Sequence, residues 1–141
     1  MKKMFLFLIV VISILPLSAV YHKIGGFDTP GSALSVFVSN NIAYVADEGS
    51  GLQIINVSNT QNPFLLGSYN TPGNARSVVV SNNIAYVTDW VYGLQIIDVS
   101  NPHNPALVGS YDTTGIAYSV FVSNNIAYVA DYWAGLQIID V

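Results

Sequence analysis

Short apolar runs alternate with polar turn signals along the chain after residue 21. The runs of the first full unit are 35–39, 42–46, 52–57 and 64–69. The pair Asn40-Asn41 separates the first two runs, and asparagine tolerates the positive φ angles that a two-residue hairpin turn requires. Asn62-Pro63 precedes the fourth run, where proline cannot donate a ladder hydrogen bond. This pattern predicts a four-stranded antiparallel meander.

The same unit recurs with an offset of 42 residues. The segments 35–57, 77–99 and 119–141 are near-identical, and the linkers 62–73 and 104–115 also match each other. The apolar character of the strands is nearly continuous, so both faces of each sheet must be covered. Four-stranded units of this length, whose faces pack on like units, predict an all-β protein built from the blades of a β-propeller.

The third run of each unit carries a recognisable motif. It reads LQIIDV at 94–99, with relatives at 52–57 and 136–141. This motif resembles the LVIVD repeat, a family of roughly forty-residue units in bacterial and archaeal surface proteins. The resemblance covers essentially everything after residue 21. It implies a β-propeller fold, and it implies no activity, catalytic residue or cofactor.

The ends of the repeat region bear on the number of blades. Residues 23–27 match the fourth strand of a unit, and the sequence ends after a third strand at 136–141, so we expect twelve strands or three blades. Three interpretations remain: two chains complete a six-bladed ring, each end strand joining a blade of the other chain; the sequence is a truncated piece of a longer array; or an open array stays monomeric. The expected domains are a signal peptide at 1–19 and repeats over 20–141, with blade units at about 32–73, 74–115 and 116–141 plus a strand at 22–28.

The first nineteen residues have the parts of a secretory signal. Lys2 and Lys3 form a charged start, and an apolar run follows at 4–15. Small residues then precede an expected cleavage site after Ala19. The apolar run is short for a membrane span. We therefore expect cleavage after Ala19 and an extracellular or cell-surface protein, with a retained N-terminal anchor as the alternative.

Composition excludes several classes of function. The chain has a net charge of −4 and no cysteine, and only 9 % of its residues are charged. A nucleic-acid binder needs a basic surface, so DNA and RNA are poor candidate partners. The absence of cysteine removes disulfides, thiolate metal sites and thiol catalysis. We expect no cofactor.

The candidate chemical groups do not suggest an enzyme. His22 and His103 lie in or beside linkers that do not repeat them. Asp47, Asp89 and Asp131 recur at the end of the second strand, where a turn-capping bond to nearby backbone N–H groups is expected. One carboxylate per loop is too few for a calcium site, although metal sharing around a channel mouth is the alternative. The sequence thus predicts no catalytic residue and no metal site.

Variation between the repeats is concentrated at one edge of the meander. The turn between strands one and two is identical in all copies, whereas the turn between strands two and three and the connection to the next unit both vary. Alternate turns of a meander share an edge, and aromatic residues there suit binding of a protein, peptide or glycan. The alternatives are neutral drift of the turns, and a structural or adhesive array without a discrete ligand. The predicted partner-binding face consists of Arg76, Trp90, Tyr92, Tyr118, Tyr132 and Trp133.

Overall fold

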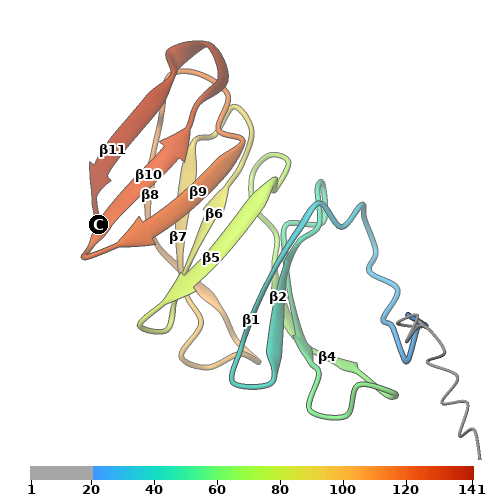
Figure 1. Ribbon diagram of the computed structural model, residues 1–141. Coiled ribbons are helices and arrows are strands. Elements are labelled where there is room, and N and C mark those ends of the chain that lie inside the picture. Colours follow the sequence, from blue (N-terminus) through green and yellow to red (C-terminus); the bar gives the residue numbers. More distant parts are fainter. Residues whose placement is uncertain (1–20) are drawn as a thin grey trace, which may run out of the picture.

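A computed structural model describes residues 21–141, which form eleven strands in three antiparallel sheets (Figure 1). Each sheet with its loops is called a blade. Blade 1 contains β1 (Ser35–Ser39), β2 (Ile42–Ala46), β3 (Leu52–Asn56) and β4 (Phe64–Tyr69). Blade 2 contains β5 (Ser77–Ser81), β6 (Ile84–Thr88), β7 (Leu94–Asp98) and β8 (Ala106–Tyr111). Blade 3 contains β9 (Ser119–Ser123), β10 (Ile126–Ala130) and β11 (Leu136–Asp140), with the single-turn 3-10 helix η1 (Tyr132–Ala134) between the last two strands.

The first hairpin of each blade has the predicted turn. Ser39 pairs with Ile42, so Asn40 and Asn41 form a two-residue loop, and their φ angles are 50° and 62°. The equivalent asparagines of blades 2 and 3 also have positive φ. The asparagine pairs therefore fix the strand register at the same point in every repeat.

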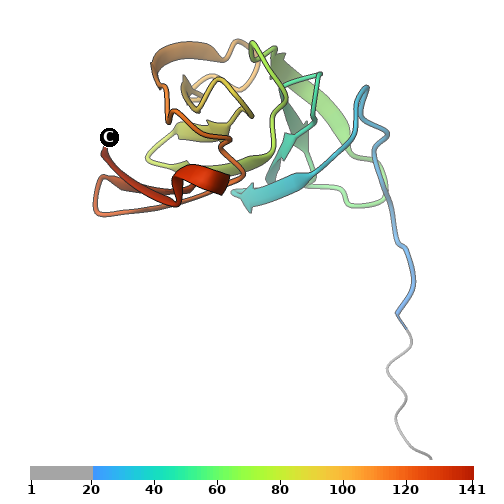
Figure 2. The same cartoon turned by 90° about the horizontal axis from the view of Figure 1, so that it is seen from above.

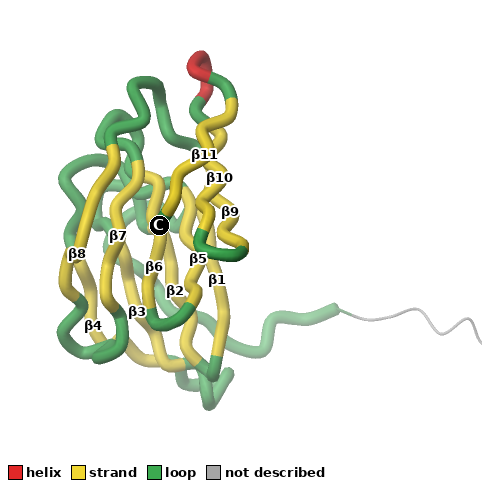
Figure 3. Tube along the Cα trace, turned by 90° about the vertical axis from the view of Figure 1, so that its left-hand side faces the viewer, coloured by secondary structure: helices red, strands yellow, loops and turns green. Residues whose placement is uncertain are grey.

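The blades stack face to face, and the first strands of the three blades lie next to one another. β1 lies beside β5, and β5 lies beside β9. Figure 3 shows the fourth strands β4 and β8 along the opposite side of the stack. We call the side of a blade that meets the next blade its forward face, and the other side its rear face.

The core lies in the two junctions between blades. At the first junction, Tyr44, Leu52 and Ile54 of the forward face of blade 1 cluster with Val87 and Ile97 of the rear face of blade 2. At the second junction, the equivalent residues of blades 2 and 3 form the cluster Tyr86, Leu94, Ala117, Val120, Ala127, Val129 and Ile139. Each large aliphatic side chain removed from water contributes about 1.5–3 kcal/mol. Burial between blades therefore supplies the main stabilisation of the fold.

The predicted strand at 22–28 is wrong, because residues 21–29 form no strand. Within residues 21–141, no third strand pairs with this segment. The segment nevertheless keeps the position of a fourth strand. A Cβ atom added to Gly25 would collide with the carbonyl oxygen of Thr60, just as one added to Gly67 in β4 would collide with that of Pro102.

The three blades form an open arc rather than a closed ring. β11 lies at one end of the arc and the N-terminal segment at the other (Figure 2). The architecture is consistent with propeller-like repeats. Within residues 21–141, no helix is long and apolar enough to cross a membrane. The predicted signal peptide at 1–19 lies outside the described residues.

Candidate functional site

The variable turns of neighbouring blades meet at one edge of the stack. The turn after β2 forms an isolated bridge between Glu48 and Ala75, and the turn after β6 forms the equivalent bridge between Trp90 and Ala117. Each bridge joins the second turn of one blade to the connection that enters the next blade. The two variable segments identified in the sequence are therefore in direct contact.

Five of the six predicted face residues form a continuous row of contacts. The guanidinium carbon of Arg76 lies 3.9 Å from the centre of the Trp90 ring. The ring centres of Trp90 and Tyr118 are 6.4 Å apart, and those of Tyr118 and Tyr132 are 5.6 Å apart. Tyr132 meets Trp133 edge to face at 5.1 Å. We call these five residues the aromatic row.

The row is most exposed at its blade 3 end. Trp133 is 69 % exposed and Tyr132 is 66 % exposed, whereas Arg76 and Trp90 are half-buried. The Nε atom of Arg76 is buried and has no hydrogen-bond partner. The guanidinium carbon lies closer to the Trp90 ring than to the Tyr118 ring, whose centre is 5.4 Å away. Tyr92, the sixth predicted residue, is also exposed at this edge but lies against Gly73, outside the row.

The backbone of the second turn holds its first residue in the left-handed region. The φ angles are 45° at Glu48, 50° at Trp90 and 39° at Tyr132. This conformation costs about 1–2 kcal/mol for a residue with a side chain. Glu48 adopts it as well, so the turn and not the aromatic side chain imposes the conformation. The aromatic residues of blades 2 and 3 are thus carried on a preformed turn.

The recurring aspartates have a different role from the predicted turn cap. Asp89 is fully buried, and its Oδ1 accepts a hydrogen bond of 2.7 Å from the Thr71 hydroxyl. Its Oδ2 accepts a 2.8 Å bond from the backbone N–H of Gly73. Asp47 receives the same two bonds from Thr29 and Gly31. The prediction of a bond to nearby backbone is therefore wrong, because these donors lie 16 and 18 residues upstream.

Each aspartate clamps the segment that enters its blade onto the end of the second strand. Burial raises the pKa of Asp89, while the bonds from Thr71 and Gly73 oppose that rise. The threonines were not predicted from the sequence. Thr29, Thr71 and Thr113 recur at a constant distance before each aspartate, and this coincidence of two repeated polar residues is the signal that could have found them.

The third clamp is incomplete. Asp131 accepts a 2.7 Å bond from Thr113, but its buried Oδ2 has no partner. Thr114, which stands where the clamp of Asp89 has Pro72, has a φ of 62°. Proline is restricted to a φ near −65° and cannot adopt this conformation. Where the backbone has changed, the Gly115 N–H does not donate to Asp131 Oδ2. In the other two clamps, the equivalent N–H groups of Gly31 and Gly73 donate to the aspartate.

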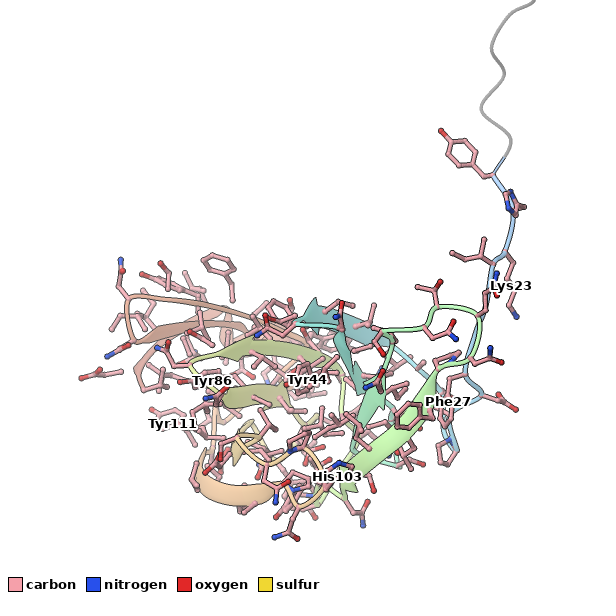
Figure 4. The ribbon with its side chains drawn as sticks, turned by 90° about the horizontal axis from the view of Figure 1, so that it is seen from below. Lys23, Phe27, Tyr44, Tyr86, His103 and Tyr111 are labelled. Atoms are coloured by element: carbon pink, nitrogen blue, oxygen red, sulfur yellow. The ribbon has the colours of Figure 1, made fainter. Side chains whose placement is uncertain are left out.

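The remaining titratable groups are dispersed. Nδ1 of the exposed His103 lies 3.0 Å from the carbonyl oxygen of Leu66, which fastens the loop after β7 to β4 (Figure 4). His22 is exposed on the N-terminal segment. Within residues 21–141, no group of three or more His, Cys, Asp or Glu side chains is placed to hold a metal ion. The chemistry of the aromatic row is therefore that of aromatic rings and one guanidinium.

Comparisons with known proteins agree with the repeat pattern. The LVIVD repeat matches residues 30–71, 72–113 and 114–141. No curated protein matches the chain. Among solved structures, the computationally designed Ika4 protein is similar with a TM-score of 0.55 at 7 % identity, covering 86 % of this chain and 99 % of that chain. At that identity the likeness concerns the fold alone. The three matched repeats cover most of the sequence, and the chain belongs to the LVIVD repeat family.

Proposed function

We propose that the edge carrying the aromatic row binds a protein, peptide or glycan at the outside of the cell, without catalysis. The observation that supports this most is the row itself, in which loops of two blades bring Arg76, Trp90, Tyr118, Tyr132 and Trp133 into contact. Rigid aromatic rings offer a large contact area at low entropic cost. Exposed apolar area of this kind is usually kept small unless it is used.

Within the row, we assign different roles to its two ends. Trp133 and Tyr132 are the ligand anchors, because they expose the most ring surface. Arg76 and Trp90 hold the other end of the row in place, since the guanidinium stacked on the half-buried indole restrains both side chains. Tyr118 contacts both Trp90 and Tyr132 and so couples the support to the anchors.

The second candidate function is a structural or adhesive array. It is favoured by the apolar residues left exposed at the two ends of the arc, including Val36 in blade 1 and Leu136 in blade 3. Such faces suit contact with further blades. In that case the aromatic residues would be products of drift in the turns, and no ligand would depend on them.

Glycan and peptide arrays probed with the purified protein test the proposal. On any ligand found, Trp133→Ala and Tyr132→Ala should each weaken binding about thirtyfold, equivalent to about 2 kcal/mol for an aromatic anchor. Phe64→Ala is the matched control, because Phe64 is also exposed but lies at the opposite edge, at the start of β4. Unchanged affinity in both anchor variants, with an unchanged circular dichroism spectrum, would place the binding site elsewhere and favour the array.

A further inference from the structure

The forward face of blade 3 is uncovered, although its sequence is that of a junction. Leu52 and Leu94 are fully buried at their junctions, whereas the equivalent Leu136 is 62 % exposed. Ile138 is 65 % exposed, while its counterpart Ile54 is fully buried. Phe121 and Tyr128 add to the same exposed surface and contact each other. The third blade thus presents the half of a junction that has no counterpart within residues 21–141.

The rear face of blade 1 is the other half of such a junction. Val36 is 62 % exposed, whereas its equivalents Val78 and Val120 are buried against the preceding blade. An apolar hollow of ≈ 340 Å³ lies between this face and the N-terminal segment, with Ile24, Phe27, Ala43, Val45, Ile55 and Val57 in its lining. In blade 2 the equivalent face is covered by the forward face of blade 1.

We propose that a second copy of this chain covers both faces. The forward face of blade 3 in one copy packs on the rear face of blade 1 in the other, and two such junctions join two chains into a ring. The structure contains the proposed contact twice already, between blades 1 and 2 and between blades 2 and 3. Since the side chains of the repeats are nearly the same, the proposed junction joins surfaces whose equivalents pack together at the other two junctions.

The free edge of β11 identifies the strand that the second copy supplies. In blade 1, β3 pairs with β4 so that Leu52 lies opposite Tyr69 and Ile54 opposite Gly67. The same register on β11 places Phe27 of the second copy opposite Leu136, and Gly25 of the second copy opposite Ile138. The segment that forms no strand in the single chain therefore becomes the fourth strand of blade 3 in its neighbour. Figure 4 shows this segment, with Lys23 and Phe27, extending from the end of the stack.

Gly135 supports this register. A Cβ atom added to Gly51 or Gly93 would collide with the carbonyl oxygen of the fourth strand, at Tyr69 and Tyr111 respectively. Gly135 has the same left-handed backbone, with φ of 73°, yet nothing lies within 4 Å of its added Cβ. In the proposed junction the carbonyl group of Phe27 of the second copy fills this space.

The backbone bridge at the variable edge gives the same alignment. The N–H of Ala75 donates to the carbonyl oxygen of Glu48 at 3.0 Å, and that of Ala117 donates to the carbonyl oxygen of Trp90 at 3.0 Å. The next residues in these two series are Ala33 and Tyr132. At the proposed junction, the N–H of Ala33 in the second copy therefore donates to the carbonyl oxygen of Tyr132.

Two chains can cover each other's free faces at blades 1 and 3. A contact between different surfaces either closes into a ring or grows into a filament. Three blades from each of two chains make six, which lies within the usual range of four to eight for closed propellers. Closure also removes the exposed edge of β11, and free edges of this kind invite aggregation.

Light scattering coupled to size-exclusion chromatography tests the proposal on the chain expressed from Met1 in a secreting host, with its N-terminus recorded by mass spectrometry. The expected species is a dimer whose mass does not rise with concentration. Leu136→Asp alters only the forward face of blade 3, and Val36→Asp alters only the rear face of blade 1. Each variant should raise the dimer dissociation constant by about a hundredfold or more, because a charge would be buried without a partner.

Mixing the two variants distinguishes this junction from other dimer contacts. Each variant keeps one intact face, so an equimolar mixture should form a heterodimer through a single junction, whereas the double variant should stay monomeric with either. Leu107→Asp is the control, because Leu107 and its equivalent Leu65 are similarly exposed on the fourth strands, at 44 % and 43 %. A monomeric wild-type chain, a mass that grows with concentration, or a mixture that forms no heterodimer would overturn the proposal.

Discussion

Blades 2 and 3 have nearly the same sequence and different surroundings. Leu94 in β7 is fully buried by blade 3, whereas Leu136 in β11 is 62 % exposed. Gly93 is pressed against the backbone of β8, whereas Gly135 faces open space. The strands and the first hairpin turn are the same in both blades, so local sequence determines these elements, and the neighbouring blade determines burial. Stability in such a stack is a sum of blade terms and junction terms.

Alanine substitutions at Leu94 and Leu136 should differ most in their effect on the free energy of unfolding, because only Leu94 lies in a closed junction. Leu94→Ala leaves a cavity in a closed junction and should lower the free energy of unfolding by about 2–5 kcal/mol. Leu136→Ala removes a side chain that is already largely solvated and should cost less than about 1 kcal/mol in a single chain. Both are measured by urea unfolding in the Val36→Asp background, which keeps the chain monomeric under the proposed assembly.

The contrast between the leucines would fail if Leu136→Ala cost as much as Leu94→Ala in that background. Blade 3 would then be covered within the single chain. Without Val36→Asp, the cost of Leu136→Ala should rise with protein concentration, because the dimer buries this side chain.

Alanine at the two glycines gives a smaller difference of the same kind. Gly135→Ala meets only the strain of a left-handed backbone, about 1 kcal/mol. Gly93→Ala has the same strain and also directs its methyl group at the carbonyl oxygen of Tyr111, so its cost should be about 2–3 kcal/mol. Thermal unfolding of the monomeric background measures both, and equal costs would show that β8 yields to the methyl group.

Much of the fold could be predicted from the repeat. The strands 35–39, 42–46 and 64–69 have the predicted bounds, because asparagine pairs and proline mark their limits. The edge shared by the variable turns also follows from meander topology, so the aromatic residues could be placed together. Which aromatic residue contacts which could not be predicted, since this depends on which blade covers which turn.

What the sequence could not reveal depends on partners distant along the chain. The hydrogen bonds of Asp89 come from Thr71 and Gly73 in the preceding connection, whereas local reasoning assigned it to its own turn. The segment 22–28 has the pattern of a strand but lacks a neighbouring strand, and strands require pairing. In both cases the missing information was the identity of the neighbouring segment.

The incomplete clamp of blade 3 offers a stabilising substitution of about 1 kcal/mol. Thr114→Pro should bring φ back from 62° to the proline range and allow the Gly115 N–H to reach the unpartnered Oδ2 of Asp131. The satisfied buried acceptor should outweigh the exposed 2.9 Å bond from the Thr114 N–H to Asp112 Oδ1, which proline removes. The reverse substitution, Pro72→Thr, should lose a similar amount in the clamp of Asp89. Urea unfolding of both variants checks this, and a less stable Thr114→Pro would mean that the turn requires the left-handed conformation.

The smallest expected effect concerns the turn after the third strand, where blade 2 has Asp98 and blade 1 has Asn56. Asp98 Oδ1 accepts a 2.8 Å bond from the N–H of Ser100, and Asn56 Oδ1 accepts a 3.0 Å bond from that of Ser58. The bonds from Ser100 hold the pKa of Asp98 below its usual value. The folded state therefore favours the charged form. Its contribution to stability is present above the unfolded pKa of about 3.9 and is lost as the pH falls through the lower folded pKa.

Asp98→Asn keeps the acceptor oxygen and removes the charge. The variant should melt slightly below the wild-type protein at pH 7, and the difference should disappear on the acid side of the folded pKa of Asp98. Asn56→Asp is the reciprocal change and should introduce the same pH dependence into blade 1, because Ser58 is placed to donate to the new carboxylate. Melting curves at a series of pH values check both variants. A constant difference across the series would show that the Ser100 bond, and not the charge it stabilises, accounts for the effect.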